Sequence, residues 1–240
     1  MNKYSKKYLD KISSSKVYDV VIKSPITKAE SVSSQFNNKI YLKREDLQPT
    51  RSFKIRGAYN KISNLVEKQK VKHVVTASAG NHAQGVAYSA KSLKIKSTIF
   101  MPKTTPSIKV DSVRNLGAKV ILIGDNFDAA LEDSLLFCKN KKLPFIHPFD
   151  DPLVIAGQGT IGKELLDQFD ENIDIVFVAV GGGGLISGIG AYIKSVKPKI
   201  KIIAVEAADA AGLNASLKAD KRIKLQEVGL FADGAAAKQI

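Results

Sequence analysis

Four consecutive glycines, Gly181, Gly182, Gly183 and Gly184, stand between an apolar run of β-branched residues and a segment with helical spacing. Because glycine has no side chain, the four backbone N–H groups can converge on one anion. The positive end of the following helix favours negative charge at the same place. No Gly-Lys-Ser/Thr sequence closes the loop, which excludes a Walker loop. A tight strand-to-helix turn is the alternative, but one turn rarely needs four glycines, so we predict a phosphate site.

A second candidate is Lys54, which follows Phe53 and leads directly into a predicted helix. The chain has 37 lysines and arginines, of which only five are arginines, so a solvated surface lysine is the default interpretation. An amine becomes a nucleophile when an apolar wall and nearby cations lower its pKa. We expect Arg51 and Arg56 to supply those cations.

The third segment is Ser78, Ala79, Gly80 and Asn81, between a predicted strand and a predicted helix that begins at His82. Backbone donors at such a helix start can hold a carboxylate, and Asn81 adds one acceptor and two N–H donors. An ordinary helix cap is the alternative.

A lysine nucleophile, a phosphate loop and a carboxylate loop together suit pyridoxal phosphate and an amino-acid substrate. This cofactor needs a lysine for its Schiff base and a site for its phosphate.

A G-x-G-x-x-G pattern also occurs, at Gly157, Gly159 and Gly162. A nicotinamide site needs a strand before this pattern and an acidic ribose ligand roughly 20 residues after it. The preceding residues read DDPLVIA and the later ones VFVAV, so neither condition is met. We therefore predict that these glycines permit close helix packing.

No histidine or cysteine has metal-ligand spacing, and we expect no metal site. His73, His82 and His147 are predicted to be structural. Cys138 is the single cysteine, which excludes an intrachain disulfide and fits a reducing compartment. Its neighbours are apolar, so we predict a core thiol.

The composition indicates a soluble globular protein, with 44% hydrophobic and 25% charged residues. It excludes a disordered chain, a collagen-like chain and a membrane bundle.

The N-terminus has no apolar core of signal-peptide length, and no segment could span a bilayer, so we expect a cytoplasmic protein without membrane contact. The net charge of +14 comes from lysines spread without a block. A solvated lysine-rich surface is favoured over nucleic-acid binding or attraction of anionic small molecules.

Short β-branched runs alternate with helical stretches along the chain. Strands are predicted at residues 39–43, 71–76, 97–101, 119–123, 143–147, 174–180 and 200–205. Helices are predicted at residues 57–68, 82–92, 108–116, 127–139, 159–169 and 185–195. This alternation predicts an α/β fold with mostly parallel, doubly wound sheets, in which residues 174–180 form a buried strand. Ligands of such sheets bind at the carboxyl ends of strands, near a helix N-terminus, so the chemistry of this chain is expected there.

The chain closely resembles the biosynthetic threonine dehydratases (threonine ammonia-lyases), in the tryptophan-synthase-β-like, fold type II group of pyridoxal phosphate enzymes. The similarity runs from about Val17 to the last residue. The matching stretches include KREDLQPTRSFKIRGAYNKI, TASAGNHAQGVAYSA, HPFDDPLVIAGQGTIGKELL, VFVAVGGGGLISGI, IIAVEAADAAGLNASL and VGLFADGAAAKQI. The resemblance implies two lobes with the cofactor in the cleft between them. Residues 1–56 and 145–240 would form the large lobe, and residues 57–144 a small inserted lobe.

The resemblance also implies a role for each matching residue. Lys54 would form the Schiff base with the cofactor and later act as the base on the substrate α-carbon. Phe53 would lie against the cofactor ring, and Asn81 would hydrogen-bond its phenolic oxygen. Ser78, Ala79, Gly80 and Asn81 would hold the substrate carboxylate. Gly181, Gly182, Gly183 and Gly184, with Leu185, would bind the phosphate.

The implied reaction converts L-threonine to 2-oxobutanoate and ammonia, the entry to isoleucine biosynthesis. An L-serine dehydratase or a serine racemase is the alternative within the enzymes. A non-catalytic relic that binds only the cofactor or a partner chain is the alternative from another class.

The family's catalytic core continues beyond the position of Ile240 and supplies a serine that faces the pyridine nitrogen. The resemblance therefore predicts that the last strands of the large lobe and the regulatory domain are missing here. The chain would then be a fragment, one half of a split protein or a decayed copy, and a full-length form would be a homo-oligomer. Ala235, Ala236 and Ala237 replace bulkier β-branched residues of the family, which predicts looser packing there.

Overall fold

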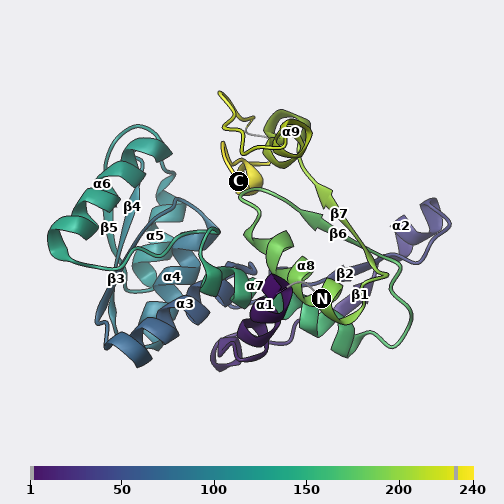
Figure 1. The fold of residues 1–240 in the computed structure, drawn as a ribbon. Helices are drawn as coiled ribbons and strands as arrows, with labels where there is room; N and C mark the ends of the chain where they lie inside the picture. The colour runs from purple at the N-terminus through teal and green to yellow at the C-terminus, as the bar shows by residue number, and fades with distance from the viewer. Residues whose placement is uncertain (1–2, 230–231) are drawn as a thin grey trace.

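The computed structural model describes residues 3–229 and 232–240 and shows an α/β protein (Figure 1). The helices are α1 (Lys3–Ser13), α2 (Glu30–Gln35), α3 (Lys54–Gln69), α4 (Asn81–Ser92), α5 (Ser107–Asn115), α6 (Phe127–Lys141), α7 (Pro152–Gln168), α8 (Gly184–Val196) and α9 (Gly212–Ala219). The strands are β1 (Ile26–Lys28), β2 (Tyr41–Lys43), β3 (His73–Ala77), β4 (Lys96–Met101), β5 (Lys119–Leu122), β6 (Ile175–Ala179) and β7 (Lys201–Val205). Short 3₁₀ helices cover Val17–Asp19, Glu45–Leu47, Ala208–Ala210 and Asp233–Ala235.

The sheet of β3, β4 and β5 is parallel and has helices on both faces. Val74 and Ile99 point to the face covered by α3, α4 and α5. Val75 and Phe100, the next residues along each strand, point to α6 on the other face. Successive side chains of a strand alternate between faces, so both halves of each apolar run are buried. This sheet confirms the predicted doubly wound architecture, and Cys138 of α6 lies in its core as predicted.

Strands β6 and β7 form a parallel pair with helices on one face only. Val178 packs into a cluster with Ile189 and Ile193 of α8. On the opposite face, Phe177 is 66% exposed and Ile203 37% exposed. The prediction of a fully buried strand was therefore wrong for this face, because no second layer of the described chain covers it.

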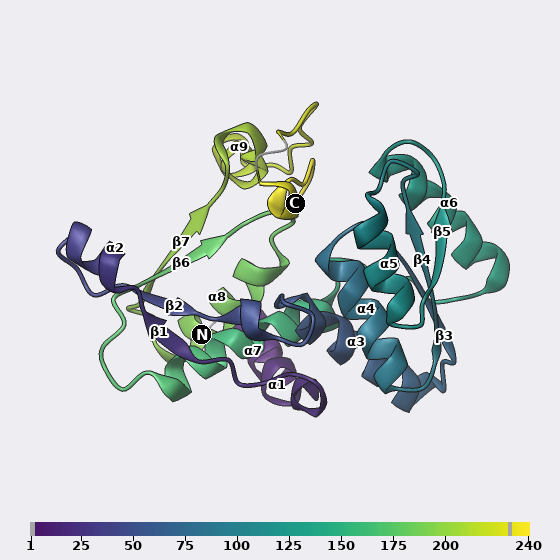
Figure 2. The same ribbon diagram turned by 180° about the vertical axis from the view of Figure 1, so that it is seen from behind.

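Helix α7 lies between α3 and α8 and approaches both closely. A Cβ added to Gly157 would lie 2.6 Å from the backbone oxygen of Arg56 in α3. A Cβ added to Gly188 of α8 would lie 2.6 Å from the backbone nitrogen of Gly159. Only glycine permits such backbone approaches, so the packing predicted for the G-x-G-x-x-G pattern is confirmed. Helix α1 lies beside α7 and α8, as the view from behind shows (Figure 2). Its Ile12 is buried in a cluster with Ala156 of α7 and Tyr192 of α8.

Several predicted boundaries differ from the structure for local reasons. Helix α7 begins at Pro152 rather than at residue 159, because Asp151 caps it and proline suits the first helical position. Residues 143–147 form only an isolated bridge, Val75 to Phe145, rather than a strand. Helices α1, α2 and α9 and strand β1 were not predicted. The division into a large lobe and a small inserted lobe of residues 57–144 stays a prediction. Helix α3 begins at Lys54, before the predicted boundary, and it contacts both α4 and α7.

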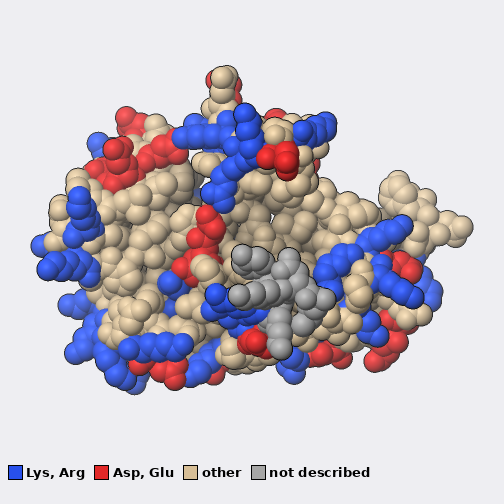
Figure 3. Space-filling model, viewed as in Figure 1, with Lys and Arg blue, Asp and Glu red and all other residues tan. Residues whose placement is uncertain are grey.

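Charge is dispersed on the face drawn in Figure 3, where Lys and Arg are interspersed with Asp and Glu around its edges. Among the described residues, no helix is long and apolar enough to cross a membrane. The same part of the chain holds no cluster of three or more His, Cys, Asp or Glu side chains arranged for a metal ion.

Candidate active site

Lys54 is the first residue of α3, and its amine points toward the segment that precedes α7. The Nζ atom donates to the carbonyl oxygen of Pro148 across 3.0 Å and lies 5.5 Å from the centre of the Phe53 ring. Burial lowers the pKa of the Lys54 amine to about 8. The expected contribution of Arg51 and Arg56 was wrong, because Arg51 is exposed and the Arg56 guanidinium pairs with carboxylates. Desolvation alone therefore brings the pKa of this amine closer to neutral, which favours the uncharged form that a nucleophile needs.

The glycine loop, residues 181–184, connects β6 to α8. Gly183 has a φ of +82°, a conformation that disfavours any side chain. A Cβ on Gly182 would collide with the ring of Phe149, and one on Gly184 would lie 2.7 Å from the Phe149 oxygen. Within the described residues, no side chain caps α8. The first N–H groups of this helix can therefore receive an anion, and phosphate binding by the loop stays a prediction.

One cavity of about 80 Å³ brings most of the predicted residues together. Phe53, Lys54, the glycine loop and Leu185 all line it. A larger hollow of about 370 Å³ adjoins the other side of Phe149 and the loop, toward α9. Phe149 and Gln158 also line the smaller cavity, and the sequence analysis gave neither a role. The only available signal for Gln158 was its position inside the G-x-G-x-x-G pattern, which we had interpreted as packing alone.

The carboxylate loop, residues 78–81, lies at the carboxyl end of β3 and is not part of this cavity lining. Ser78 Oγ accepts a hydrogen bond from the backbone N–H of Gly80 across 3.2 Å, outside the helix. In the part of the chain that the structure describes, no side chain caps α4, so the alternative of an ordinary cap was wrong. The first N–H groups of α4 therefore have no side-chain partner among these residues.

Packing of α4 on α3 nevertheless brings the loop beside Lys54. A Cβ added to Gly85 would lie 3.1 Å from the Lys54 carbonyl carbon. Asn81 and Gly85 are four residues apart on α4 and share one face of the helix. Asn81 thus stands one turn before the point where α4 touches the backbone of Lys54.

His82, next to Asn81, is a buried residue that contacts the backbone of Ile146. Its side chain is 3% exposed, and Nε2 lies 3.0 Å from the carbonyl oxygen of Ile146. Burial, and then the positive charge of Lys54, lower the pKa of His82 to about 3. His73 pairs with Thr98, as expected of a structural histidine.

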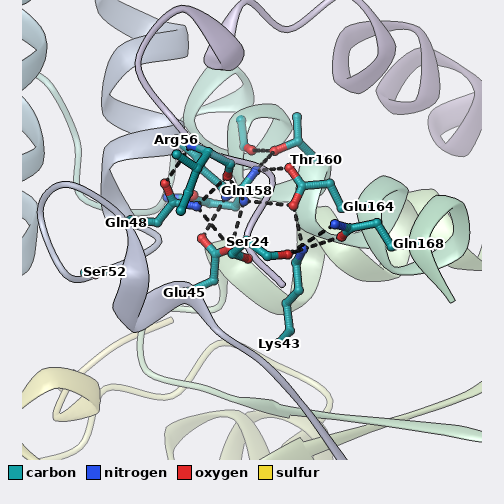
Figure 4. Close-up of polar contacts among 12 residues, drawn as sticks. Ser24, Lys43, Glu45, Gln48, Ser52, Arg56, Gln158, Thr160, Glu164 and Gln168 are labelled. Carbon is teal, nitrogen blue, oxygen red and sulfur yellow. Dashed lines mark hydrogen bonds and ion pairs between the residues drawn. The ribbon is translucent and has the colours of Figure 1, made fainter. Parts of the chain in front are cut away.

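A buried polar network anchors the first turn of α3 (Figure 4). The Arg56 guanidinium donates to both carboxylate oxygens of Glu45 and to both of Glu164. Lys43 Nζ lies 2.6 Å from Glu164 Oε2, which gives two positive and two negative groups. Burial alone would lower the pKa of Arg56, but its hydrogen bonds to Glu45 and Glu164 raise it. Burial lowers the pKa of Lys43 despite its bond to Glu164.

These residues fit pyridoxal phosphate by their chemistry. A desolvated amine with a lowered pKa can bond the aldehyde carbon, and an uncapped helix start with four glycines can bind the phosphate. Both line one cavity, and apolar rings of Phe53 and Phe149 stand beside them.

Comparison with known proteins agrees with this chemistry. A model of the family described as pyridoxal-phosphate dependent enzyme matches residues 17–240. The mitochondrial threonine dehydratase of Schizosaccharomyces pombe is 53% identical over 235 residues, 97% of this chain and 39% of that protein. The processed form of threonine deaminase isoform 2 from Solanum lycopersicum has a TM-score of 0.96 at 48% identity, covering 100% of this chain and 66% of that one. Maize serine racemase has a TM-score of 0.91 at 35% identity, covering 95% of this chain and 70% of that one. This chain thus spans less than half the length of the S. pombe relative.

Proposed function

The chain belongs to the family of pyridoxal-phosphate-dependent enzymes, and on this premise we propose that it dehydrates and deaminates L-threonine. The products are 2-oxobutanoate and ammonia, and the reaction is the first step of isoleucine biosynthesis. Bound pyridoxal phosphate supplies an electron sink for the negative charge that develops at the substrate α-carbon. The observation that carries the proposal is the desolvated Lys54 amine in one cavity with the uncapped glycine loop.

Lys54 has two tasks in this proposal. Its Nζ holds the cofactor between turnovers and, once the substrate has displaced it, removes the α-proton. A pKa of about 8 leaves a useful fraction of the amine neutral near pH 7, as a general base requires. The β-hydroxyl then leaves as water, and hydrolysis releases ammonia, so one threonine yields one 2-oxobutanoate and one ammonia.

Two helix starts orient the reactants around Lys54. The N–H groups of the glycine loop, residues 181–184, with Leu185, bind the phosphate at the start of α8. The carboxylate loop, Ser78, Ala79, Gly80 and Asn81, holds the substrate carboxylate at the start of α4, and Asn81 reaches the phenolic oxygen of the cofactor. Gly85 supports this arrangement, because it packs the first turns of α4 against the backbone of Lys54.

Threonine is favoured over serine because the threonine enzymes are the more similar relatives, at 53% and 48% identity against 35% for the maize serine racemase. Serine dehydration and serine racemisation are the second candidate, since the racemase shares the fold at a TM-score of 0.91. A cytoplasmic site of action and assembly into a homo-oligomer complete the proposal.

The test is a product assay on the purified chain with pyridoxal phosphate. We expect L-threonine to give 2-oxobutanoate and ammonia in equal amounts, L-serine to react with a lower kcat/KM, and Lys54→Ala to abolish both reactions. Preferential reaction of L-serine, or formation of D-serine, would establish the second candidate instead.

A cofactor-loaded chain that releases no product would support the non-catalytic interpretation for this chain alone. The assay is then repeated with the remaining third of the tomato enzyme added as a separate polypeptide. Activity restored by that addition keeps the proposed reaction, and continued inactivity ends it.

A further inference from the structure

Gln158 is a buried polar residue of α7 that the proposed mechanism does not use. Its side chain is 1% exposed, yet it lines the same cavity as Lys54 and the glycine loop. Buried amide groups are normally satisfied at both ends. A buried glutamine whose amide nitrogen opens on a ligand cavity and has no protein partner among the described residues therefore indicates a contact with the ligand.

The orientation of the Gln158 amide is determined by a backbone donor. The N–H of Gly57, in the first turn of α3, donates to Gln158 Oε1 across 3.2 Å. Only the oxygen of an amide can accept this bond, so Nε2 must be the other end. Within the part of the chain that the structure describes, this is the only hydrogen bond of the Gln158 side chain. A Cβ on Gly57 would lie 2.6 Å from Nε2, so the glycine also leaves room for the amide.

The composition of the cavity lining makes Gln158 distinctive. Among the described residues that line it, only Lys54 and Gln158 have side chains that donate hydrogen bonds. Lys54 is committed to the aldehyde carbon of the cofactor. The doubly charged phosphate at the other end is then left with backbone N–H groups and the Gln158 amide as its donors in this lining.

We propose that Gln158 is a cofactor-binding residue whose Nε2 donates a hydrogen bond to the phosphate of pyridoxal phosphate while its Oε1 caps the helix of Lys54. The inference rests on the proposed function, because it assumes the cofactor in this cavity. One side chain then links the two ends of the site, the lysine at one end and the phosphate at the other.

The test compares cofactor affinities of two variants. Gln158→Glu keeps an acceptor for the Gly57 N–H but has no donor for the phosphate, and Gln158→Met has neither. Gln168→Glu makes the same change on the same helix away from the cavity and serves as the control. Binding of pyridoxal 5′-phosphate and of phosphate-free pyridoxal is measured by absorbance titration, and unfolding of the cofactor-free chains by circular dichroism.

We expect both Gln158 variants to bind pyridoxal phosphate at least about tenfold more weakly, as for loss of a hydrogen bond to a charged group. Pyridoxal binding should change less than about twofold, and Gln168→Glu should bind both like the wild type. A purely structural role would lower the unfolding temperature of cofactor-free Gln158→Glu and weaken both ligands equally, which would overturn the proposal. Unchanged pyridoxal phosphate binding would overturn it too.

A measurement on the unmodified protein guards against misfolded variants. In a chain labelled with ¹⁵N-glutamine, the Gln158 side-chain signal should shift when pyridoxal phosphate is added, and a stationary signal contradicts the proposal. If the wild type binds no pyridoxal phosphate at all, the proposed function fails along with the inference. If the wild type binds and the variants match it, the inference alone fails.

Discussion

Arg56 and Glu164 face each other through two hydrogen bonds, Nη1 to Oε1 at 2.6 Å and Nη2 to Oε2 at 3.0 Å. Arg56 is 0% and Glu164 1% exposed, so the pair is shielded from water. Arg56 belongs to the first turn of α3, two residues after Lys54, and Glu164 belongs to α7. The pair therefore holds the helix that begins with Lys54 to the helix that carries Gln158.

Removing one partner of this pair should destabilise the fold strongly. Arg56→Met leaves the buried carboxylate of Glu164 and the partly buried carboxylate of Glu45 without their main cation, and breaking a buried pair typically costs about 3–5 kcal/mol. Arg114→Met removes an exposed partner of Asp111 and should cost less than about 1 kcal/mol. Urea unfolding of both variants, compared with the wild type, measures the difference. Equal costs would show that the buried network contributes no more than a surface ion pair.

The lowered pKa of Lys54 predicts the pH dependence of cofactor attachment. Only the neutral amine attacks an aldehyde, so the attachment rate should rise with pH and level off above about 8. Below that value the rate should fall about tenfold per pH unit. The rate is followed by borohydride trapping and mass spectrometry at fixed times, with Lys54→Ala as the blank. A midpoint near 10.5, the ordinary value for lysine, would mean that the amine is not desolvated.

Two glycines of α8 should respond oppositely to substitution by alanine. A Cβ on Gly188 would lie 2.6 Å from Gly159 N, so Gly188→Ala should cost about 2–3 kcal/mol by overpacking. A Cβ on Gly190 would meet nothing nearer than Ile202 Cδ1 at 3.8 Å. Gly190→Ala should therefore be neutral or stabilise by up to about 1 kcal/mol, as alanine favours a helix. Thermal unfolding distinguishes them, and equal midpoints for the two variants would refute the close α7–α8 contact.

Two adjacent residues of β6, Phe177 and Val178, should lose different amounts of stability when each is replaced by threonine. Phe177 is 66% exposed, so Phe177→Thr should change stability by less than about 0.5 kcal/mol and should reduce aggregation. Val178 is 4% exposed, and Val178→Thr should cost about 1–3 kcal/mol by burying a hydroxyl. Urea unfolding and light scattering measure the two effects. A large stability loss in Phe177→Thr would show that another part of the molecule covers this face.

The sequence predicted those elements that are determined by residues close together in the chain. The glycine loop, most of the β-branched segments and the lysine after Phe53 all depend on neighbouring residues, and the structure has them where they were predicted. Residues 143–147 are the exception, because they form only an isolated bridge. The cause of the lowered Lys54 pKa was missed because burial of the amine arises only in the folded chain, where Pro148, distant in sequence, contacts Nζ. The exposure of Phe177 was missed because an apolar strand has the same sequence pattern whether one or both of its faces are covered.

Gln158 and the Arg56 network were missed for a related reason. Glutamine, arginine and glutamate are usually surface residues, and only the packing of α3 on α7 buries them here. The carboxylate loop was predicted from spacing, and its role in substrate binding stays a prediction. The structure adds that the start of its helix lies beside Lys54.

In evolutionary terms, the two glycine contacts of α7 restrict each other. Gly157 touches α3 on one side of the helix and Gly159 touches α8 on another, so a shift of α7 that relieves crowding at one contact tightens the other. A larger residue at either position can be accommodated only by a second substitution in the neighbouring helix. Gly57 with Gly157, and Gly188 with Gly159, should therefore change together between descendants of this chain.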